Sequence, residues 1–220
     1  MQLSSMESPL LLLYESKKAD IQKRLDELNK VKYEPDERIF AELCFCLCTP
    51  QTKASASDKA IKELISTGLL FSGNPEDIAQ ILEKHGVRFN NNKARYIVSA
   101  RQMFSRNGQV KIKSMINTDD LWGLRNWIAD NVMGLGMKEA THFLRNIGHG
   151  SDLAILDRHI LAELFKYKVI SDVPLVLSKN KYLHIERQMK EFAKSINIGM
   201  LELDMVFWSE HGSLPIEVMK

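Results

Sequence analysis

The sequence predicts an all-α protein, and three observations lead to that class. Apolar residues recur at three- and four-residue spacing through most of the 220-residue chain, which is the period of an amphipathic helix. Strand patterns are almost absent, because "VRF" and "QVKIK" are too short to make a sheet on their own. Proline, glycine and capping residues divide the chain into about ten helical segments.

The first helices are predicted from their ends. An amphipathic helix is expected over residues 10–30. Asp36 is expected to cap the strongly apolar helix "ERIFAELCFCLC", which stops near Pro50. The segment "KASASDKAIKELISTG" is typical of a helix closed by Gly68.

The next helix has all three signals of a helix boundary. Asn74 is its predicted cap, Pro75 lies in its first turn, and Gly86 follows its end. Another helix is expected through "KARYIVSARQMFSRNG".

The C-terminal half continues the helical pattern. Thr118 is a candidate cap for the helix "TDDLWGLRNWIADNVMG", and further helices are expected over 137–147, 158–168 and about 200–210. One more helix is predicted from an apolar stripe at three- and four-residue spacing, formed by Tyr182, Ile185, Met189, Phe192 and Ile196.

Composition excludes several classes of protein. Hydrophobic residues make up 45% of the chain and charged residues 26%, which is typical of a globular protein and not of a disordered or fibrous one. No apolar run approaches the roughly 20 residues of a membrane span. The run "PLLLLY" at 9–14 is short, and no basic segment precedes it as in a secretory signal. We therefore expect a soluble, cytoplasmic protein without a membrane partner.

The three cysteines lie close together at Cys44, Cys46 and Cys48. No histidine or further cysteine follows at zinc spacing, and an iron–sulfur cluster needs four cysteines. Buried, reduced thiols in an apolar helix are the favoured interpretation. We expect no metal site built from side chains.

Charge is distributed unevenly although the formal net charge is only +2. The window from Lys84 to Thr118 contains no acidic residue. Such a window indicates either a solvated helix face or a positive surface that meets nucleic-acid phosphates. Its basic residues are Lys84, Arg88, Lys93, Arg95, Arg101, Arg106, Lys111 and Lys113.

A Gly-x-Gly turn separates two short helical patterns in "VMGLGMKEATHFLRNIGHGSDLAILD", residues 132–157. We expect the helices to meet across a tight hairpin, as a motif over about residues 124–147. Gly134 and Gly136 permit positive φ and close backbone approach, and the amides at the start of the second helix favour an anion. A pattern of this kind alone is more often structural than functional.

Two residues beside the turn strengthen a functional interpretation. Lys138 lies in the first turn of the second helix, where the helix dipole disfavours an ammonium, and a free amine is a nucleophile. Asp157 precedes the helix "RHILAELF", so it is either an N-cap or a carboxylate that accepts a proton or stabilises a cation.

The combination of "GLGMKEATHFLRNIG" with "DLAILDRHIL" resembles the helix–hairpin–helix DNA glycosylase superfamily, most closely its type-2 8-oxoguanine DNA glycosylase/AP lyase branch. The segments "GVRFNNNKARYIVSAR" and "LCFCLCT" extend the resemblance over most of the chain. It implies a single DNA glycosylase domain over residues 1–220, made of two helical subdomains that flank a cleft. The four-cysteine cluster of endonuclease III-like relatives is missing, because no cysteine follows Cys48, and there is no strand pattern for the N-terminal domain of type-1 relatives.

The resemblance also implies a mechanism. Lys138 attacks the sugar C1′ and displaces 8-oxoguanine, Asp157 assists deprotonation and stabilises positive charge on the sugar, and the Schiff base permits β-elimination that nicks the strand. Gly134 and Gly136 hold a DNA phosphate, with a monovalent cation on the hairpin carbonyls and no other cofactor. Double-stranded DNA containing 8-oxoguanine or an abasic site is the implied partner of a monomeric, nucleoid-associated enzyme.

Four residues outside the hairpin are weaker candidates. Arg158 and His159 start the helix after Asp157, where they contact phosphate or are simply solvated. Trp208 is either a core residue or the flat surface against which the flipped base packs. In the type-2 branch the chain ends in a lysine whose carboxylate lies at the base pocket, and the final residue here is Lys220.

Three other functions remain open from the residues alone. The first is a helix–hairpin–helix module that only binds DNA, and the second is a glycosylase for another oxidised base. The third is a helical adaptor protein in which the glycine turn is merely a tight corner. Spacing and composition do not identify the base, which rests on the resemblance.

Overall fold

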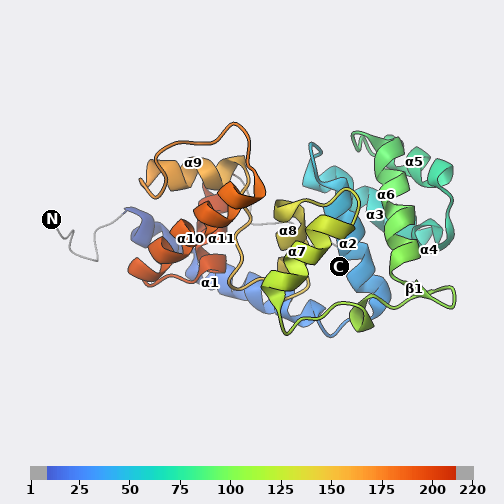
Figure 1. Ribbon diagram of the computed structural model, residues 1–220, viewed down its shortest axis with the longest axis horizontal. Helices are drawn as coiled ribbons and strands as arrows, with labels where there is room; N and C mark the ends of the chain where they lie inside the picture. The colour runs from blue at the N-terminus through green and yellow to red at the C-terminus, as the bar shows by residue number, and fades with distance from the viewer. Residues whose placement is uncertain (1–8, 212–220) are drawn as a thin grey trace. The chain divides into compact units, whose positions relative to one another are not determined.

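The computed structural model describes residues 9–211. The described chain is built almost entirely of helices, as predicted, with one two-stranded hairpin (Figure 1). The elements in order are α1 (Pro9–Val31), α2 (Asp36–Cys48), α3 (Ala54–Ser66), α4 (Leu69–Ser72), α5 (Pro75–Lys84), α6 (Asn90–Met103), β1 (Ser105–Arg106), β2 (Gln109–Val110), the 3-10 helix η1 (Ile112–Ser114), α7 (Leu121–Asn131), α8 (Met137–Asn146), α9 (Arg158–Lys166), α10 (Lys179–Ser195) and α11 (Met200–Ser209).

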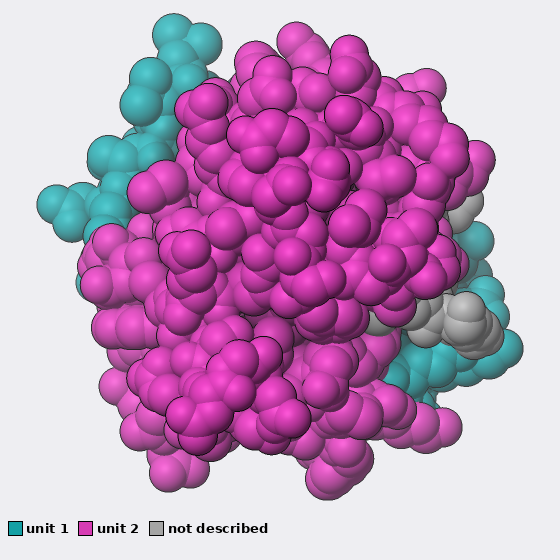
Figure 2. Space-filling view, turned by 90° about the vertical axis from the view of Figure 1, so that its right-hand side faces the viewer, with its two compact units in different colours: residues 1–29, 150–215 teal, residues 30–149, 216–220 magenta. Residues whose placement is uncertain are grey.

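The described residues divide into two compact units, coloured separately in Figure 2. Unit 1 contains residues 9–29 and 150–211, and unit 2 contains residues 30–149. Unit 1 thus combines most of α1 with α9, α10 and α11, whereas unit 2 is continuous and carries α2 to α8.

Unit 2 is organised around α2. Every residue from Ile39 to Cys48 is buried, and α3, α6, α8 and η1 pack around this helix. A helix that is buried on all sides and apolar except for Glu42 is stable at the centre of such a bundle. The three thiols lie in this core as free cysteines, so the interpretation of Cys44, Cys46 and Cys48 as buried, reduced side chains is confirmed.

Unit 1 packs the apolar faces of its helices together. The predicted stripe on α10 is buried at Tyr182, Ile185 and Met189, and α11 buries a run from Leu203 to Phe207. Tyr167, the C-cap of α9, stacks on the Phe207 ring with centroids 5.6 Å apart. Burial beside Glu202 raises the pKa of the Tyr14 phenol on α1 to about 12.

Two predicted helix caps are wrong and one is confirmed. The Asn74 side chain accepts a hydrogen bond from the Asp77 amide at 2.8 Å. Asp36 lies inside the first turn of α2, where its carboxylate accepts from the Lys113 amide at 2.8 Å. The cap of α7 is Asp120, which accepts from the Gly123 amide, and not Thr118.

The short hairpin β1–β2 turns at Asn107 and Gly108, which both have positive φ, as in a two-residue hairpin loop of type I′. The segment "QVKIK" therefore contributes one strand of two residues to an antiparallel pair and no larger sheet. Among the described residues, no helix has the length and hydrophobicity of a membrane span.

Candidate active site

The predicted hairpin is present in unit 2. Helices α7 and α8 lie side by side (Figure 1) and are joined by residues 132–136. Gly134 has φ +92°, and a Cβ there would lie 2.3 Å from a ring carbon of Tyr96. Any other residue at Gly134 would be strained in its backbone and would displace the Tyr96 ring.

Gly136 has a different role from the one expected. Its φ is −102°, so the expectation of positive φ is wrong at this position. Gly136 is the N-cap of α8, and no side chain caps this helix. In the described chain, the amides of Met137, Lys138 and Glu139 therefore donate to no protein group. Such amides at a helix start form a site for an anion such as phosphate.

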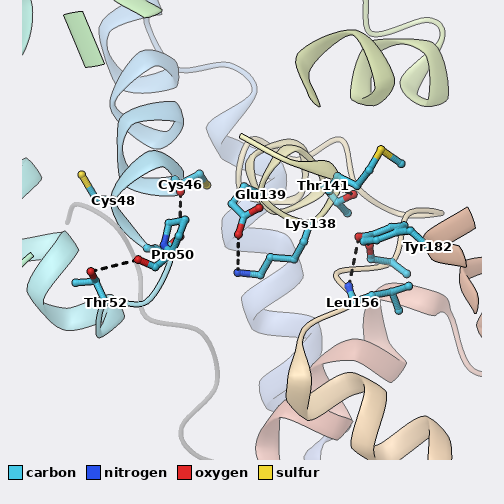
Figure 3. A network of polar contacts seen from close by, with 12 residues as sticks. Cys46, Cys48, Pro50, Thr52, Lys138, Glu139, Thr141, Leu156 and Tyr182 are labelled. Atoms are coloured by element: carbon cyan, nitrogen blue, oxygen red, sulfur yellow. Dashed lines mark hydrogen bonds and ion pairs between the residues drawn. The ribbon is translucent and has the colours of Figure 1, made fainter. Parts of the chain in front are cut away.

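Lys138 follows directly on this helix start. Its side chain is partly exposed, and in the described chain its one ion pair is with Glu139, 3.5 Å from Nζ to Oε1 (Figure 3). Two ionisable side chains near Lys138, those of Cys46 and His142, are uncharged at neutral pH. Burial raises the pKa of the Cys46 thiol well above its usual range despite the nearby Lys138 cation. Burial likewise lowers the pKa of His142, one turn along α8.

In unit 1, Asp157 follows a buried segment whose backbone is hydrogen-bonded to side chains of α10. Residues Leu153 to Leu156 are buried. The Ala154 amide donates to Glu186 at 2.8 Å, and the Tyr182 hydroxyl donates to the Ala154 carbonyl and accepts from the Leu156 amide at 3.3 Å (Figure 3). This segment ends at Asp157 and fixes the start of α9.

The Asp157 carboxylate uses one oxygen for the helix. Oδ1 accepts from the amides of His159 at 2.8 Å and Ile160 at 2.9 Å, so the N-cap interpretation is confirmed. No hydrogen bond to Oδ2 is found within residues 9–211. The cap thus fixes the orientation of the carboxylate and leaves one oxygen for other chemistry.

The weaker candidates in unit 1 gather beside Asp157. Arg158 is exposed, and its Nε lies 3.1 Å from His159 Nε2. The Trp208 ring is half-buried, with its centroid 5.5 Å from that of His159. Lys220 lies outside the described residues.

Sequence reasoning missed two residues of this cluster. The His211 ring packs against the His159 ring with centroids 4.6 Å apart and ring planes inclined by 37°, and its Nε2 lies 3.0 Å from Oε1 of the buried Glu163. No local motif links Glu163 and His211, because 48 residues separate them.

The basic window of unit 2 is partly structural. Lys93 is buried, and its Nζ donates to the Cys48 and Pro50 carbonyls and to Thr52. Arg101 donates to carbonyls around α4, the closest being Gly73 at 2.6 Å. Two exposed residues of the window have partners, because Lys84 pairs with Glu63 and Lys113 donates to the Glu34 carbonyl. A positive surface formed by the exposed residues remains a prediction. These residues are Lys84, Arg88, Arg95, Arg106, Lys111 and Lys113.

The candidate site residues therefore fall into two sets, one in each unit. Unit 2 brings together Gly134, Gly136 and Lys138, and unit 1 brings together Asp157, Arg158, His159 and Trp208. An all-α fold with a hairpin between paired helices and a lysine at the start of the second helix is that of a helix–hairpin–helix DNA glycosylase.

Comparison with known proteins narrows this class. The family model described as 8-oxoguanine DNA glycosylase matches residues 21–198. The chain belongs to the 8-oxoguanine DNA glycosylase family.

Similar proteins cover most of the chain. An 8-oxoguanine DNA glycosylase/AP lyase of Fusobacterium nucleatum is 37% identical over 89% of this chain and 90% of its own length. The crystal structure of Methanocaldococcus jannaschii 8-oxoguanine glycosylase/lyase, in complex with a 15mer DNA containing 8-oxoguanine, matches with a TM-score of 0.84 and 32% identity. That match covers 95% of this chain and 100% of the other. The 8-oxoguanine DNA glycosylase of Thermotoga maritima matches with a TM-score of 0.81 and 30% identity, over 93% of this chain and 95% of the other.

Proposed function

We propose that this protein excises 8-oxoguanine from double-stranded DNA and then nicks the strand at the abasic site. The observation that carries the proposal is the position of Lys138, an amine directly after an uncapped helix start in a member of this family. The curated relatives named 8-oxoguanine DNA glycosylase/AP lyase support both activities.

The hairpin provides the binding half of the reaction. A DNA phosphate accepts hydrogen bonds from the free amides at the start of α8, and the helix dipole favours its negative charge. The carbonyls of Met133, Gly134 and Leu135 accept no backbone hydrogen bond within residues 9–211. These oxygens fit a monovalent cation, which would neutralise part of the phosphate charge.

Lys138 and Asp157 divide the chemistry. The Lys138 amine attacks C1′ of the damaged nucleotide, the bond from C1′ to the base breaks, and the base leaves with the bonding electrons and takes up a proton. The free Oδ2 of Asp157 stabilises positive charge on the sugar and accepts a proton. Loss of a C2′ proton from the resulting Schiff base then expels the 3′ phosphate, and water releases Lys138.

The base must leave the duplex to be reached. Trp208 offers a half-exposed aromatic ring for stacking against the flipped base. Lys220, the other base-pocket residue of this proposal, lies outside the described residues. Arg158 and His159 are secondary phosphate contacts in this proposal. The enzyme acts as a monomer in the cytoplasm, associated with the nucleoid.

Borohydride trapping tests the proposal. The protein is incubated with borohydride and a duplex that contains one 8-oxoguanine, and the covalent protein–DNA product is measured. A trapped product that depends on the lesion is expected. A protein that binds the duplex without release of the base or trapping would instead be a DNA-binding module. Release of a different oxidised base would identify another glycosylase.

A further inference from the structure

A cluster of side chains joins the start of α9 to the end of α11 in unit 1. It contains Glu163 and His159 from α9, Trp208 from α11, and His211 just after α11. The reaction described above uses Asp157 and Trp208 but assigns nothing to Glu163 or His211.

Glu163 is the fixed point of the cluster. Its side chain is only 6% exposed. Both carboxylate oxygens are engaged, with Oε2 accepting from Lys166 at 2.9 Å and Oε1 lying 3.0 Å from His211 Nε2. Because a buried carboxylate must keep its partners, the Glu163 side chain has little freedom to move.

Glu163 is connected to Trp208 through the imidazole rings of His211 and His159. An ionised carboxylate oxygen only accepts, so His211 donates through Nε2, and this hydrogen bond fixes the direction in which that nitrogen points. The His211 and His159 rings are in tilted contact with centroids 4.6 Å apart, and the centroids of the His159 and Trp208 rings are 5.5 Å apart. The backbone amide of His159 also donates to Asp157. One connected set of contacts therefore fixes both Trp208 and the cap of α9.

We propose that Glu163 and His211 are positioning residues for recognition of the damaged base. They hold His159 against Trp208, so that the indole is oriented before the base arrives. This inference rests on the proposed function of Trp208, and it adds two residues that never touch the substrate.

The position of His211 makes the idea testable without unfolding the protein. Its side chain is 27% exposed, and partly exposed ion pairs contribute little to global stability. Replacing His211 by Gln, which keeps a donor for Glu163, should therefore leave the melting temperature close to that of the wild type. Lys166 is the matched control, because it pairs with the other Glu163 oxygen and its only ring contact within residues 9–211 is with Tyr167, which is not part of the cluster.

Two reactions separate positioning of the base from the rest of catalysis. Wild type, His211→Leu, His211→Gln and Lys166→Met are compared in single turnover on a duplex with 8-oxoguanine and on the same duplex with a preformed abasic site. The second substrate has no base to position, so it reports on Lys138 and DNA binding alone. We expect His211→Leu to slow base excision by about tenfold or more, the scale of a small misplacement at a site, and to change abasic-site cleavage by less than about twofold.

The conservative variant His211→Gln tests whether a side chain that still donates to Glu163 restores the rate of base excision. The amide of His211→Gln can still donate to Glu163, so excision should recover most of the wild-type rate, and Lys166→Met should retain the wild-type ratio of the two rates. A parallel loss of both reactions in His211→Leu, or no loss in either, would overturn the positioning role.

A fluorescence measurement tests the positioning of Trp208 independently of the proposed enzymatic function. With Trp122 and Trp127 changed to Phe, the fluorescence of Trp208 reports its surroundings directly. His211→Leu should increase the quenching of Trp208 by acrylamide, whereas Lys166→Met should not. If the wild type releases no 8-oxoguanine, the proposed function fails, but increased quenching would still support the contact chain. Unchanged quenching would contradict it.

Discussion

Lys138 lies where a purely structural lysine would be disfavoured, at the start of α8 with one carboxylate neighbour in the described chain. Because Cys46 and His142 near it are uncharged, Glu139 supplies the compensating charge. These surroundings explain why its amine is the proposed nucleophile.

Changing Lys138→Gln removes the amine and keeps a side chain of similar length. We expect loss of the borohydride-trapped adduct and nearly unchanged DNA binding, because the phosphate is held by backbone amides. Trapping and an equilibrium binding measurement on the same duplex test this. An adduct that still forms would place the nucleophile elsewhere.

The substitution Asp157→Asn separates the role of Asp157 as a helix cap from its proposed role as a proton acceptor. Asn caps helices about as well as Asp, so the melting temperature should be close to that of the wild type. Base excision should fall by about 10²-fold or more, the scale of one general base. Thermal melting and single-turnover excision measure the two effects. A variant that melts early but excises normally would show that Asp157 serves only α9.

At the scale of elements, the helix–hairpin–helix depends on the two glycines for different reasons. Gly134 is required by its backbone conformation and by the Tyr96 ring, whereas the nearest atom to a Cβ at Gly136 would be a Glu139 oxygen at 3.5 Å. Gly136 therefore accepts a side chain, and it lies at an N-cap where Asp or Ser is favoured.

This difference gives a test of the phosphate site. Gly136→Asp should keep or slightly increase the stability of α8 and weaken DNA binding for every sequence, because phosphate contacts carry no sequence information. Gly136→Ser is the uncharged control and should bind more tightly than Gly136→Asp. Fluorescence anisotropy with two unrelated duplexes, at several salt concentrations, measures the effect. Equal affinity of Gly136→Asp and wild type at moderate salt would exclude a phosphate at this position.

The end of α2 depends on Lys93 from α6. Its ammonium replaces the missing helical donors at the Cys48 carbonyl and also binds the turn that follows, and burial lowers its pKa. Lys93→Met leaves these carbonyls without partners, so we expect the free energy of unfolding to fall by about 1–3 kcal/mol. Urea denaturation tests this, with the exposed Lys111→Met as a control that loses the same charge. Equal stability of the two variants would contradict the cap.

At the scale of the whole molecule, stability should depend on a histidine whose pKa is lowered in the folded state. His142 packs edge-on against Phe45, and its Nδ1 is sealed from solvent although the residue as a whole is half-buried. Burial, with Arg145 and Lys138 nearby, lowers the pKa of His142 well below 6.5. Below about pH 6.5 the unfolded chain then binds up to one more proton than the folded chain, so stability falls as the pH falls from about 6.5 towards the lowered pKa of His142.

His142→Phe removes this proton and keeps an aromatic ring against Phe45. The free energy of unfolding of the wild type should drop relative to the variant by at most about 1.4 kcal/mol per pH unit below about pH 6.5. Urea denaturation at neutral and mildly acidic pH measures the difference. His184→Phe, at an exposed position on α10, serves as the control. Parallel pH curves for wild type and His142→Phe would show that His142 does not couple folding to pH.

Local patterns in the sequence were sufficient for the helical class, for most helix boundaries, for the hairpin with Lys138 at the start of its second helix, and for Asp157 as the cap of α9. Periodicity, a cap such as Asn74, and a turn between two apolar stripes are all decided within a few residues. Because the motif around Lys138 is equally local, its residues indicate the family from the sequence alone.

Features that depend on distant partners required the folded chain. The sequence predicts that Asp36 caps its own helix, yet it binds the amide of Lys113, and Lys93 belongs to a charged window, yet it caps α2. The ring of Tyr96 makes Gly134 irreplaceable, and Glu163 meets His211 across 48 residues. A side chain's spacing along its own helix predicts which face it occupies, but only packing brings a particular partner to that face, and the partner determines whether a charge is solvated, buried or used.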